Sequence, residues 1–414
     1  MKSHRTTSLY LPITMFAVAT FFYLYEFVLR VSPNVLEKEL MLAFGLNAKT
    51  FGFFASCWYW SYAALQLPVG ALTDSFGPRR LLTGAILVCG LSSVVFAYTD
   101  NFVIACLART LIGAGSAFAF ISCMKIVNIW FEPRLFAVMT GMTLTIGTLG
   151  GAVAGTPLSL ALDYMDWRQI LMILGVIGLF IAMLAWFVIK DRNPAQEITV
   201  GKSSNNPPFW LCLREVAKQP QSWIVGIYAF LVTAPTDALG GSWGVKFLVD
   251  VHGLSRDVAS SAAVTMTFIG IAVGSPLLGW ISGVFDNRKI PMAVSSIIAA
   301  LALTFIIYLP HLSGLMASLL FFIFGAAGTY VLAFVMTRRF SQSVYAATAV
   351  GFVNMASMFG SAVLTYIIGW LLDLLKKGPD YSMHDYHLSL LMLPLFYAIS
   401  AILLVPLIRD GKDL

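Results

Sequence analysis

The feature that most constrains this chain is a series of long apolar runs separated by short polar segments. Twelve runs stand out, at 9–31, 50–73, 80–98, 102–128, 135–161, 169–189, 221–249, 257–284, 290–309, 314–337, 344–372 and 388–408. A helix needs about 20 apolar residues to cross the hydrocarbon core of a bilayer. The runs therefore predict an all-α membrane protein with twelve transmembrane helices.

The composition fits that class. Hydrophobic residues make up 59% of the 414 positions and charged residues only 11%, whereas soluble domains have about 45–50% and about 25%. The runs are too long for the strands of a membrane barrel and lack their alternation. The first run is also too long for a signal peptide and has no small-residue cleavage site, so we expect an uncleaved first span.

The positions of Lys and Arg predict the orientation in the membrane, because cytoplasmic loops carry an excess of these residues. With both termini placed inside, about sixteen of the 26 lie in cytoplasmic segments and about six in outer loops, while four lie within spans. We therefore expect cytoplasmic termini in a bacterial inner (plasma) membrane. The net charge of +6 reflects this topology, so no nucleic-acid partner is expected.

A long polar segment near the middle of the chain predicts a domain boundary. Residues 191–220 are rich in Asn, Ser and Pro, which is typical of a linker. We expect a first bundle at 1–190, a cytoplasmic linker at 191–220 and a second bundle at 221–414. Each bundle then holds six spans.

The two halves resemble each other in sequence. Three pairs align at offsets of 209, 210 and 212: 70–80 with 279–289, 141–163 with 351–373, and Gly113 with Gly325. Chance rarely holds nearly one offset over three separated blocks. The alignment predicts two pseudo-symmetric six-helix bundles (6+6), as internal repeats produce in transporters.

Two motifs point to a family. GALTDSFGPRR (70–80) follows the pattern G-x-x-x-D-x-x-G-x-R-R, and ARTLIGAGSAF (108–118) follows R-x-x-x-G-x-G. With the 6+6 arrangement, they resemble the major facilitator superfamily over essentially the whole chain. The resemblance implies a transporter in which these charges latch the two halves, and it assigns gating to Gly70, Asp74, Gly77, Arg79, Arg80, Arg109 and Arg134.

The residues of the first motif also have a physical interpretation. Gly70 and Gly77 allow a tight turn and a close helix approach, and Asp74 can meet the positive N-terminus of a neighbouring helix. The aligned segment of the second half has Gly283 in place of this aspartate, so we expect a lopsided cluster. The alternatives are plain topological charge for the motif and a packing role for Arg109.

A finer resemblance concerns the substrate. NIWFEPRLFAVMTG (128–141), GTP (155–157) and DWR (166–168) resemble a pattern that recurs among organic-anion and sugar-acid symporters of the superfamily. Bacterial relatives of lysosomal dipeptide transporters have similar layouts. Organic acids, amino acids and short peptides therefore all stay open as substrates.

Three charged residues inside the spans predict the site. A charge at the bilayer centre costs about 2.5–3.5 kcal/mol on insertion scales, so it needs a partner or a wet cavity. Glu26 and Arg30 are four residues apart in the first span, where they share a face and can pair. Asp237 lies at a similar depth in the seventh span, which Pro235 and the pair Gly240–Gly241 interrupt.

We expect Arg30, supported by Lys246, to bind a substrate carboxylate, and Glu26 or Asp237 to carry a proton or bind an amine. Further candidates for lining the site are Trp243, Gln66 and Asn354. Each has an alternative. The Glu26–Arg30 pair can pin the first helix to a neighbour, Lys246 can snorkel to the interface, and the two amides can bond across helices.

These observations predict a secondary transporter for a small carboxylate-bearing metabolite, working by alternating access and coupled to a proton or another ion. We expect a monomer in the lipid bilayer, with no cofactor and no metal. The alternatives are efflux of a drug or siderophore-like compound and a non-transporting membrane sensor. An enzyme is disfavoured, because the only histidine cluster, HDYH (384–387), is expected in an outer loop.

Overall fold

The computed structural model describes residues 10–132, 135–191, 209–284, 288–328, 330–340 and 346–409, and these contain helices and no strand. In the first half the helices are α1 (Tyr10–Val35), α2 (Glu37–Phe44), α3 (Ala48–Phe76), α4 (Pro78–Tyr98), α5 (Phe102–Ser116), α6 (Ala119–Trp130), α7 (Phe136–Val153), α8 (Thr156–Ala161) and α9 (Trp167–Val188). In the second half they are α10 (Phe209–Lys218), α11 (Pro220–Ala238), η2 (Leu239–Trp243), α12 (Gly244–His252), α13 (Arg256–Ser260), η3 (Ser261–Met266), α14 (Thr267–Val284), α15 (Lys289–Tyr308), α16 (Gly314–Ala327), α17 (Val331–Phe340), α18 (Ala346–Leu375), α19 (Met383–Leu390), α20 (Met392–Ile399), η4 (Ser400–Leu404) and α21 (Val405–Leu407).

The helices account for the apolar runs. Among the described residues, eleven helical segments are long and apolar enough to cross a membrane, and some of them consist of consecutive shorter helices. The pair α2 and α3, bent by 114°, gives a twelfth if it is counted as one span. The all-α membrane class is confirmed. Most of the expected linker, residues 192–208, lies outside the described residues.

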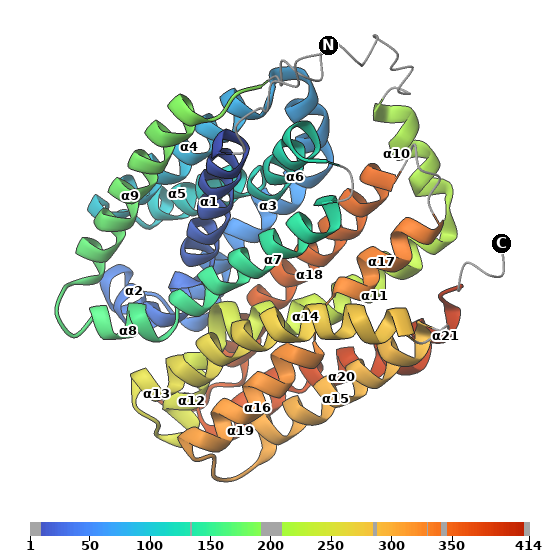
Figure 1. The fold of residues 1–414 in the computed structure, drawn as a ribbon. Coiled ribbons are helices and arrows are strands. Elements are labelled where there is room, and N and C mark those ends of the chain that lie inside the picture. The colour runs from blue at the N-terminus through green and yellow to red at the C-terminus, as the bar shows by residue number, and fades with distance from the viewer. Residues whose placement is uncertain are drawn as a thin grey trace, which may run out of the picture.

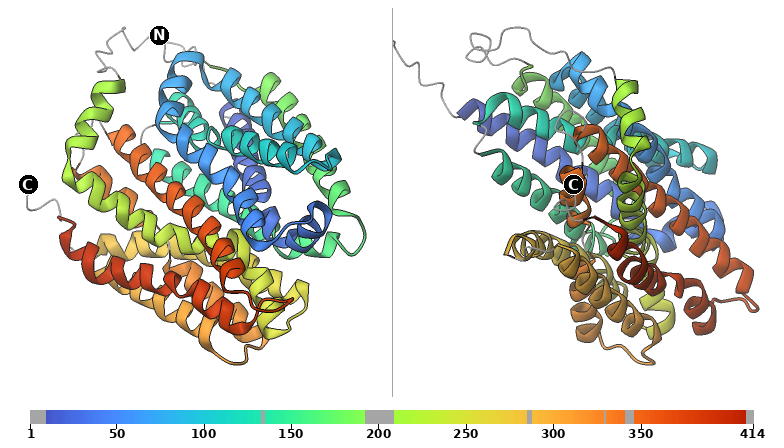
Figure 2. Two further views of the ribbon diagram at one scale, coloured as in Figure 1. Left: turned by 180° about the vertical axis from the view of Figure 1, so that it is seen from behind. Right: turned by 90° about the vertical axis from the view of Figure 1, so that its right-hand side faces the viewer.

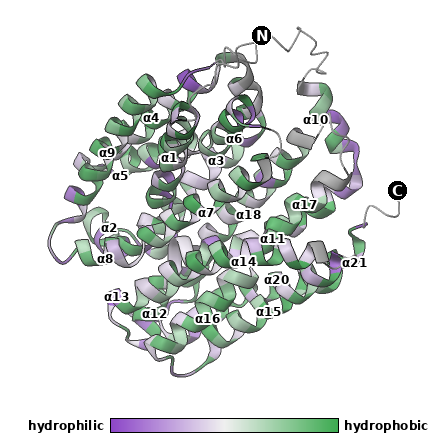
Figure 3. Ribbon diagram, in the orientation of Figure 1, coloured by the Kyte–Doolittle hydropathy of each residue, from purple (hydrophilic) through white to green (hydrophobic). Residues whose placement is uncertain are grey.

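The two halves lie side by side. The helices α1 to α9 form one bundle and α10 to α21 the other (Figure 1). Two seams join them, one where α3 packs along α18 and one where α7 packs along α14 (Figure 2). Most residues along the helices are hydrophobic, and hydrophilic residues concentrate toward the ends, for example at α10 (Figure 3).

The end of the molecule that carries α2, α8, α12, α13 and α19 is called the distal end here. It lies opposite the end where the described chain begins (Figure 1). The HDYH segment is found here as part of α19, which begins at Met383. The expectation of a loop was therefore wrong, because Ser382 and Asp385 form a capping box that starts a helix.

Glycines at equivalent places make equivalent contacts in the two halves. A Cβ on Gly150 would lie 2.1 Å from the carbonyl oxygen of Leu24, and one on Gly360 would lie 3.0 Å from that of Phe230. The first contact joins α7 to α1, and the second joins α18 to α11. These two glycines aligned in the sequence, so the repeat places the same close helix approach in each bundle.

The two glycines of the first motif behave differently in the structure. Gly77 has φ +79 between α3 and α4, a conformation that glycine adopts without strain, so the expected tight turn is confirmed. A Cβ on Gly70, in contrast, would meet nothing within 4 Å. The close helix approach expected there was wrong, since Gly70 faces open space.

We predict that Gly150→Ala destabilises the bundle while Gly141→Ala in the same helix does not. The added methyl at Gly150 would collide with the backbone of α1, whereas Gly141 has open space within 4 Å. Overpacking typically costs about 1–3 kcal/mol. The measurement is the midpoint of thermal unfolding in detergent, and equal midpoints for the two variants would contradict the close packing of α7 on α1.

Candidate functional site

One ion pair joins the two halves inside the molecule. The Nη2 of Arg30, in α1, lies 2.6 Å from both carboxylate oxygens of Asp237, in α11. The two side chains are only 6% and 5% exposed. The hydroxyl of Ser361, in α18, donates to Oδ2 of Asp237 at 2.6 Å. Buried ion pairs need such additional hydrogen bonds to offset the loss of hydration, and here Ser361 of a third helix supplies one.

Aromatic rings surround the Arg30 guanidinium. Its Cζ lies 5.2, 5.0 and 5.3 Å from the ring centroids of Phe27, Trp58 and Tyr59. Such cation–π contacts contribute about 2 kcal/mol when desolvated. Asp237 engages one guanidinium nitrogen, and Nε has no hydrogen-bond partner. The cation is therefore held by rings from α1 and α3 and keeps a donor for another acceptor.

Glu26 does not pair with Arg30, although the spacing in the sequence allowed it. The side chain of Glu26 is buried, and its Oε2 has no hydrogen-bond partner. Arg30 turns instead to Asp237 of the other half, where the carboxylate is also held by Ser361. The interpretation of Glu26 and Arg30 as an intrahelical pair is therefore corrected. A buried acid with one unpartnered oxygen stays a candidate for carrying a proton.

Pro33 interrupts the hydrogen-bond ladder of α1 beside Arg30. Proline has no N–H, so the carbonyl four residues earlier, that of Leu29, loses its helical donor. The guanidinium of Arg109, in α5, donates to this carbonyl at 2.7 Å and to the carbonyl of Arg30 at 3.3 Å. The hydroxyl of Ser32 also donates to the Leu29 carbonyl, at 3.1 Å. Arg109 thus adds a charged donor where the helix has lost its own and fixes the backbone of Arg30, which fits the packing role left open for it.

Asn34 ties α1 to the interruption of the seventh span. That interruption is a π turn, η2, rather than an unwound segment. The Nδ2 of Asn34 donates to the carbonyls of Leu239 and Gly240, both at 2.9 Å, and its Oδ1 accepts from the N–H of Val245 at 3.2 Å. A π turn displaces backbone groups from the regular ladder, and this amide bonds to three of them.

Two predicted site residues bond to groups other than the ion pair. Trp243 is fully buried, and its Nε1 donates to the carbonyl of Thr365 at 3.0 Å. Lys246 lies 3.2 Å from Glu37 and 3.3 Å from Asp250 at the distal end. Lys246 is therefore engaged by other carboxylates, and the geometry gives no support to its expected role beside Arg30.

The two amides meet each other. The Nδ2 of Asn354, in α18, donates to Oε1 of Gln66, in α3, at 2.7 Å. This bond crosses the seam between the halves, which is one of the two alternatives that the sequence left open.

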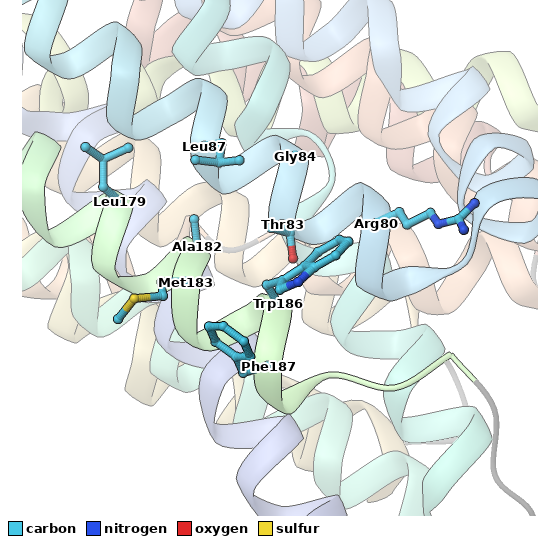
Figure 4. Close-up of a pocket in the computed structure, with 9 residues that line it drawn as sticks. All are labelled: Arg80, Thr83, Gly84, Leu87, Leu179, Ala182, Met183, Trp186 and Phe187. Atoms are coloured by element: carbon cyan, nitrogen blue, oxygen red, sulfur yellow. The ribbon is translucent and has the colours of Figure 1, made fainter.

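The arginines of the first motif contact their own half. The Nε of Arg79 donates to the carbonyl of Trp186 at 2.9 Å, and its backbone N–H donates to Asp191 at 2.8 Å. Arg80 borders a surface groove of about 440 Å³ between α4 and α9, lined mainly by apolar side chains (Figure 4). The side chain of Asp74 and all of Arg134 lie outside the described residues. The inter-half latch implied by the family resemblance stays a prediction.

Three residues of the site were missed in the sequence. Pro33 and Asn34 could have been found, because a proline and a polar residue follow Arg30 within about one turn of the first apolar run. Ser361 carried no such signal, since serines are common in these spans. Within the described ranges, no group of three or more His, Cys, Asp or Glu side chains is arranged to hold a metal ion.

We predict that Arg109→Gln destabilises the protein and that Pro33→Ala reduces this cost. Without Arg109 the buried carbonyl of Leu29 keeps only the hydroxyl of Ser32, at 3.1 Å, as a donor. A hydrogen bond to a charged group contributes about 1.5–3 kcal/mol, and an alanine at position 33 would return a backbone N–H to Leu29. Thermal unfolding of the two single variants and the double variant forms a double-mutant cycle. Strictly additive shifts in the unfolding midpoint would contradict the idea that Arg109 replaces the hydrogen-bond donor that Pro33 removes from α1.

Comparison with known proteins agrees with this architecture. The family model described as Major Facilitator Superfamily matches residues 13–262 and 225–413. The hexuronate transporter of Bacillus subtilis (strain 168) is 26% identical over 309 residues, which cover 71% of this chain and 72% of the relative. A probable hexose phosphate transport protein of Chlamydia muridarum (strain MoPn / Nigg) is 21% identical over 415 residues, covering 92% and 88%.

A solved structure gives the same fold. The crystal structure of a bacterial homologue of the human lysosomal transporter Spinster, in an inward-facing and unoccupied conformation, superposes with a TM-score of 0.77 at 17% identity and covers 97% of this chain and 98% of that one. Together with the family match, the two helical bundles and the apolar spans, this shows that the chain is a membrane transport protein rather than an enzyme and belongs to the major facilitator superfamily.

Proposed function

We propose that the protein is a proton-coupled secondary transporter that moves a small carboxylate-bearing metabolite by alternating access, with Arg30 as the anion-binding residue. The proposal rests on the buried Arg30 guanidinium, which lies between the two halves and already binds the carboxylate of Asp237. A site between two pseudo-symmetric bundles is where transporters of this kind bind their substrates.

Asp237 gives the proposal its mechanism. Its carboxylate occupies Arg30 with the same chemistry that a substrate carboxylate would use. When Asp237 takes up a proton, it loses the charge that holds Arg30, and an incoming anion can replace it. Proton and anion then bind together, the net charge around Arg30 is conserved, and both are carried in the same direction.

Glu26 is the second acid in this scheme. It lies one turn from Arg30 with an unpartnered oxygen, so it can hold the coupling proton if Asp237 does not. The direct contact of Asp237 with Arg30 favours Asp237, because protonation there changes the anion site itself.

The substrate class rests on the cation and on the names of relatives. Relatives that transport hexuronate or hexose phosphate act on anionic sugars, and an arginine suits both carboxylates and phosphates. We favour a sugar acid or another small organic acid. Amino acids and short peptides belong in the same screen, because their carboxylates would bind Arg30 equally well.

The proposed setting is a bacterial inner membrane with both termini in the cytoplasm, since about sixteen of the 26 Lys and Arg residues then lie inside. The distal end faces outward in this orientation. We propose that the protein works as a monomer.

We predict that Arg30→Ala abolishes uptake by proteoliposomes of D-glucuronate or any other anion that the wild-type protein accumulates. The substitution removes the cation that replaces the hydration of the substrate carboxylate, so binding falls by about 100-fold or more. Circular dichroism and size-exclusion chromatography check that the variant is folded. Uptake at the wild-type rate would rule out the anion site. Binding without uptake by the wild-type protein would instead favour a sensor.

We predict that Asp237→Asn retains counterflow but loses accumulation driven by a pH gradient, whereas Glu26→Gln retains both. An amide mimics the protonated acid, so Arg30 stays accessible to the anion while the proton can no longer exchange. The two activities are measured side by side in the same proteoliposomes. If Glu26→Gln loses accumulation and Asp237→Asn keeps it, the coupling role belongs to Glu26.

A further inference from the structure

At the distal end, an aspartate of one half caps a helix of the other. Asp373, in the last turn of α18, accepts hydrogen bonds from the backbone N–H groups at the start of α3. Its Oδ1 lies 3.3 Å from the nitrogen of Ala48, and its Oδ2 lies 2.8 Å from that of Lys49. A carboxylate at a helix N-terminus is stabilised by these donors and by the helix dipole.

Asp373 accepts hydrogen bonds from N–H groups of α3 that the local N-cap residue does not reach. Asn47 is the local N-cap, and its side chain accepts from the N–H of Thr50. The first N–H groups of a helix have no intrahelical partner, and Asp373 takes those of Ala48 and Lys49. The start of α3 is therefore satisfied in part by its own half and in part by the other half.

Tyr381 holds the capping carboxylate in place. Its hydroxyl donates to Oδ1 of Asp373 at 2.7 Å and accepts from the N–H of Ala48 at 3.1 Å. Burial and the Asp373 carboxylate raise the pKa of Tyr381, so the hydroxyl keeps its proton as a donor. The ammonium of Lys376 lies 4.5 Å from the ring centroid of Tyr381, where it adds a cation–π contact.

Other contacts between the halves surround this cap. Lys246, in α12 of the second half, pairs with Glu37, in α2 of the first half. Next to them lies a polar hollow of about 470 Å³, bordered by Lys246, Tyr381 and Asn47 among others. Because the cap lies beside this open hollow, water can reach its atoms as soon as the two halves separate.

We propose that Asp373 and Tyr381 form a latch that closes the distal end of the transport pathway, and that α3 must leave its cap for this end to open. The inference rests on the alternating-access mechanism proposed above. On opening, the N–H groups of Ala48 and Lys49 exchange Asp373 for water, so the latch sets the balance between the closed and open states without touching the substrate.

The repeat supplies a matched control. Asp163 is the sequence equivalent of Asp373 in the first half, yet its side chain is exposed at the distal surface. A second control is Asp380, which is exposed in the same loop as Tyr381. If charge at this surface were all that mattered, both controls would act like Asp373.

The experiment measures the opening of the distal end directly, without any substrate. Spin labels are attached at Tyr164→Cys in the first half and Leu315→Cys in the second, both at exposed positions (87% and 72%). The five native cysteines are buried. Electron–electron distance measurements then compare the wild-type background with Asp373→Ala, Asp373→Asn and Tyr381→Phe.

We expect Asp373→Ala to raise the ratio of the long-distance to the short-distance population by about tenfold. A change of this size corresponds to the free energy lost when a helix N-cap is removed. Asp373→Asn and Tyr381→Phe should shift it less, while Asp163→Asn and Asp380→Ala should leave it unchanged. Unchanged distances in Asp373→Ala and Asp373→Asn, or equal shifts in the two controls, would overturn the latch. Neither result depends on Arg30 or on which anion is carried, so the latch and the proposed function can fail separately.

Discussion

The proposed mechanism depends on one buried ion pair between the two halves. Arg30 and Asp237 come from the first and the seventh span, and each would be a costly isolated charge if its half stood alone. Their contact replaces the lost hydration and joins the bundles at the same time. Any motion that separates α1 from α11 must give these charges other partners, which a proton and an anionic substrate can supply.

The backbone around this pair is irregular on both sides, and side chains compensate for the irregularities. Pro33 removes one donor from α1, and Arg109 provides another. The π turn η2 displaces carbonyls of the seventh span, and Asn34 bonds to them. The segments that flank Arg30 and Asp237 are thus fixed by contacts with neighbouring helices. The ion pair can change partners while the helices that carry it keep their shape.

The sequence predicted the fold well because the bilayer imposes a simple rule on span length. It also placed Arg30 and Asp237 at a similar depth, which is a consequence of the repeat. It did not predict that Arg30 would choose Asp237 over Glu26, because helical spacing describes one helix and carries no information on how two bundles dock. The same limit applies to Lys246, whose partners Glu37 and Asp250 depend on the bend after α1 and on the course of α12.

The proposed mechanism requires that a substrate anion and the Asp237 carboxylate compete for Arg30. Its sharpest test is the uptake of protons when D-glucuronate is added to the purified protein in a weakly buffered solution. We expect about one proton taken up per anion bound by the wild-type protein, and none by Asp237→Asn, which should still bind. Binding by the wild-type protein with no change in bound protons would contradict the competition.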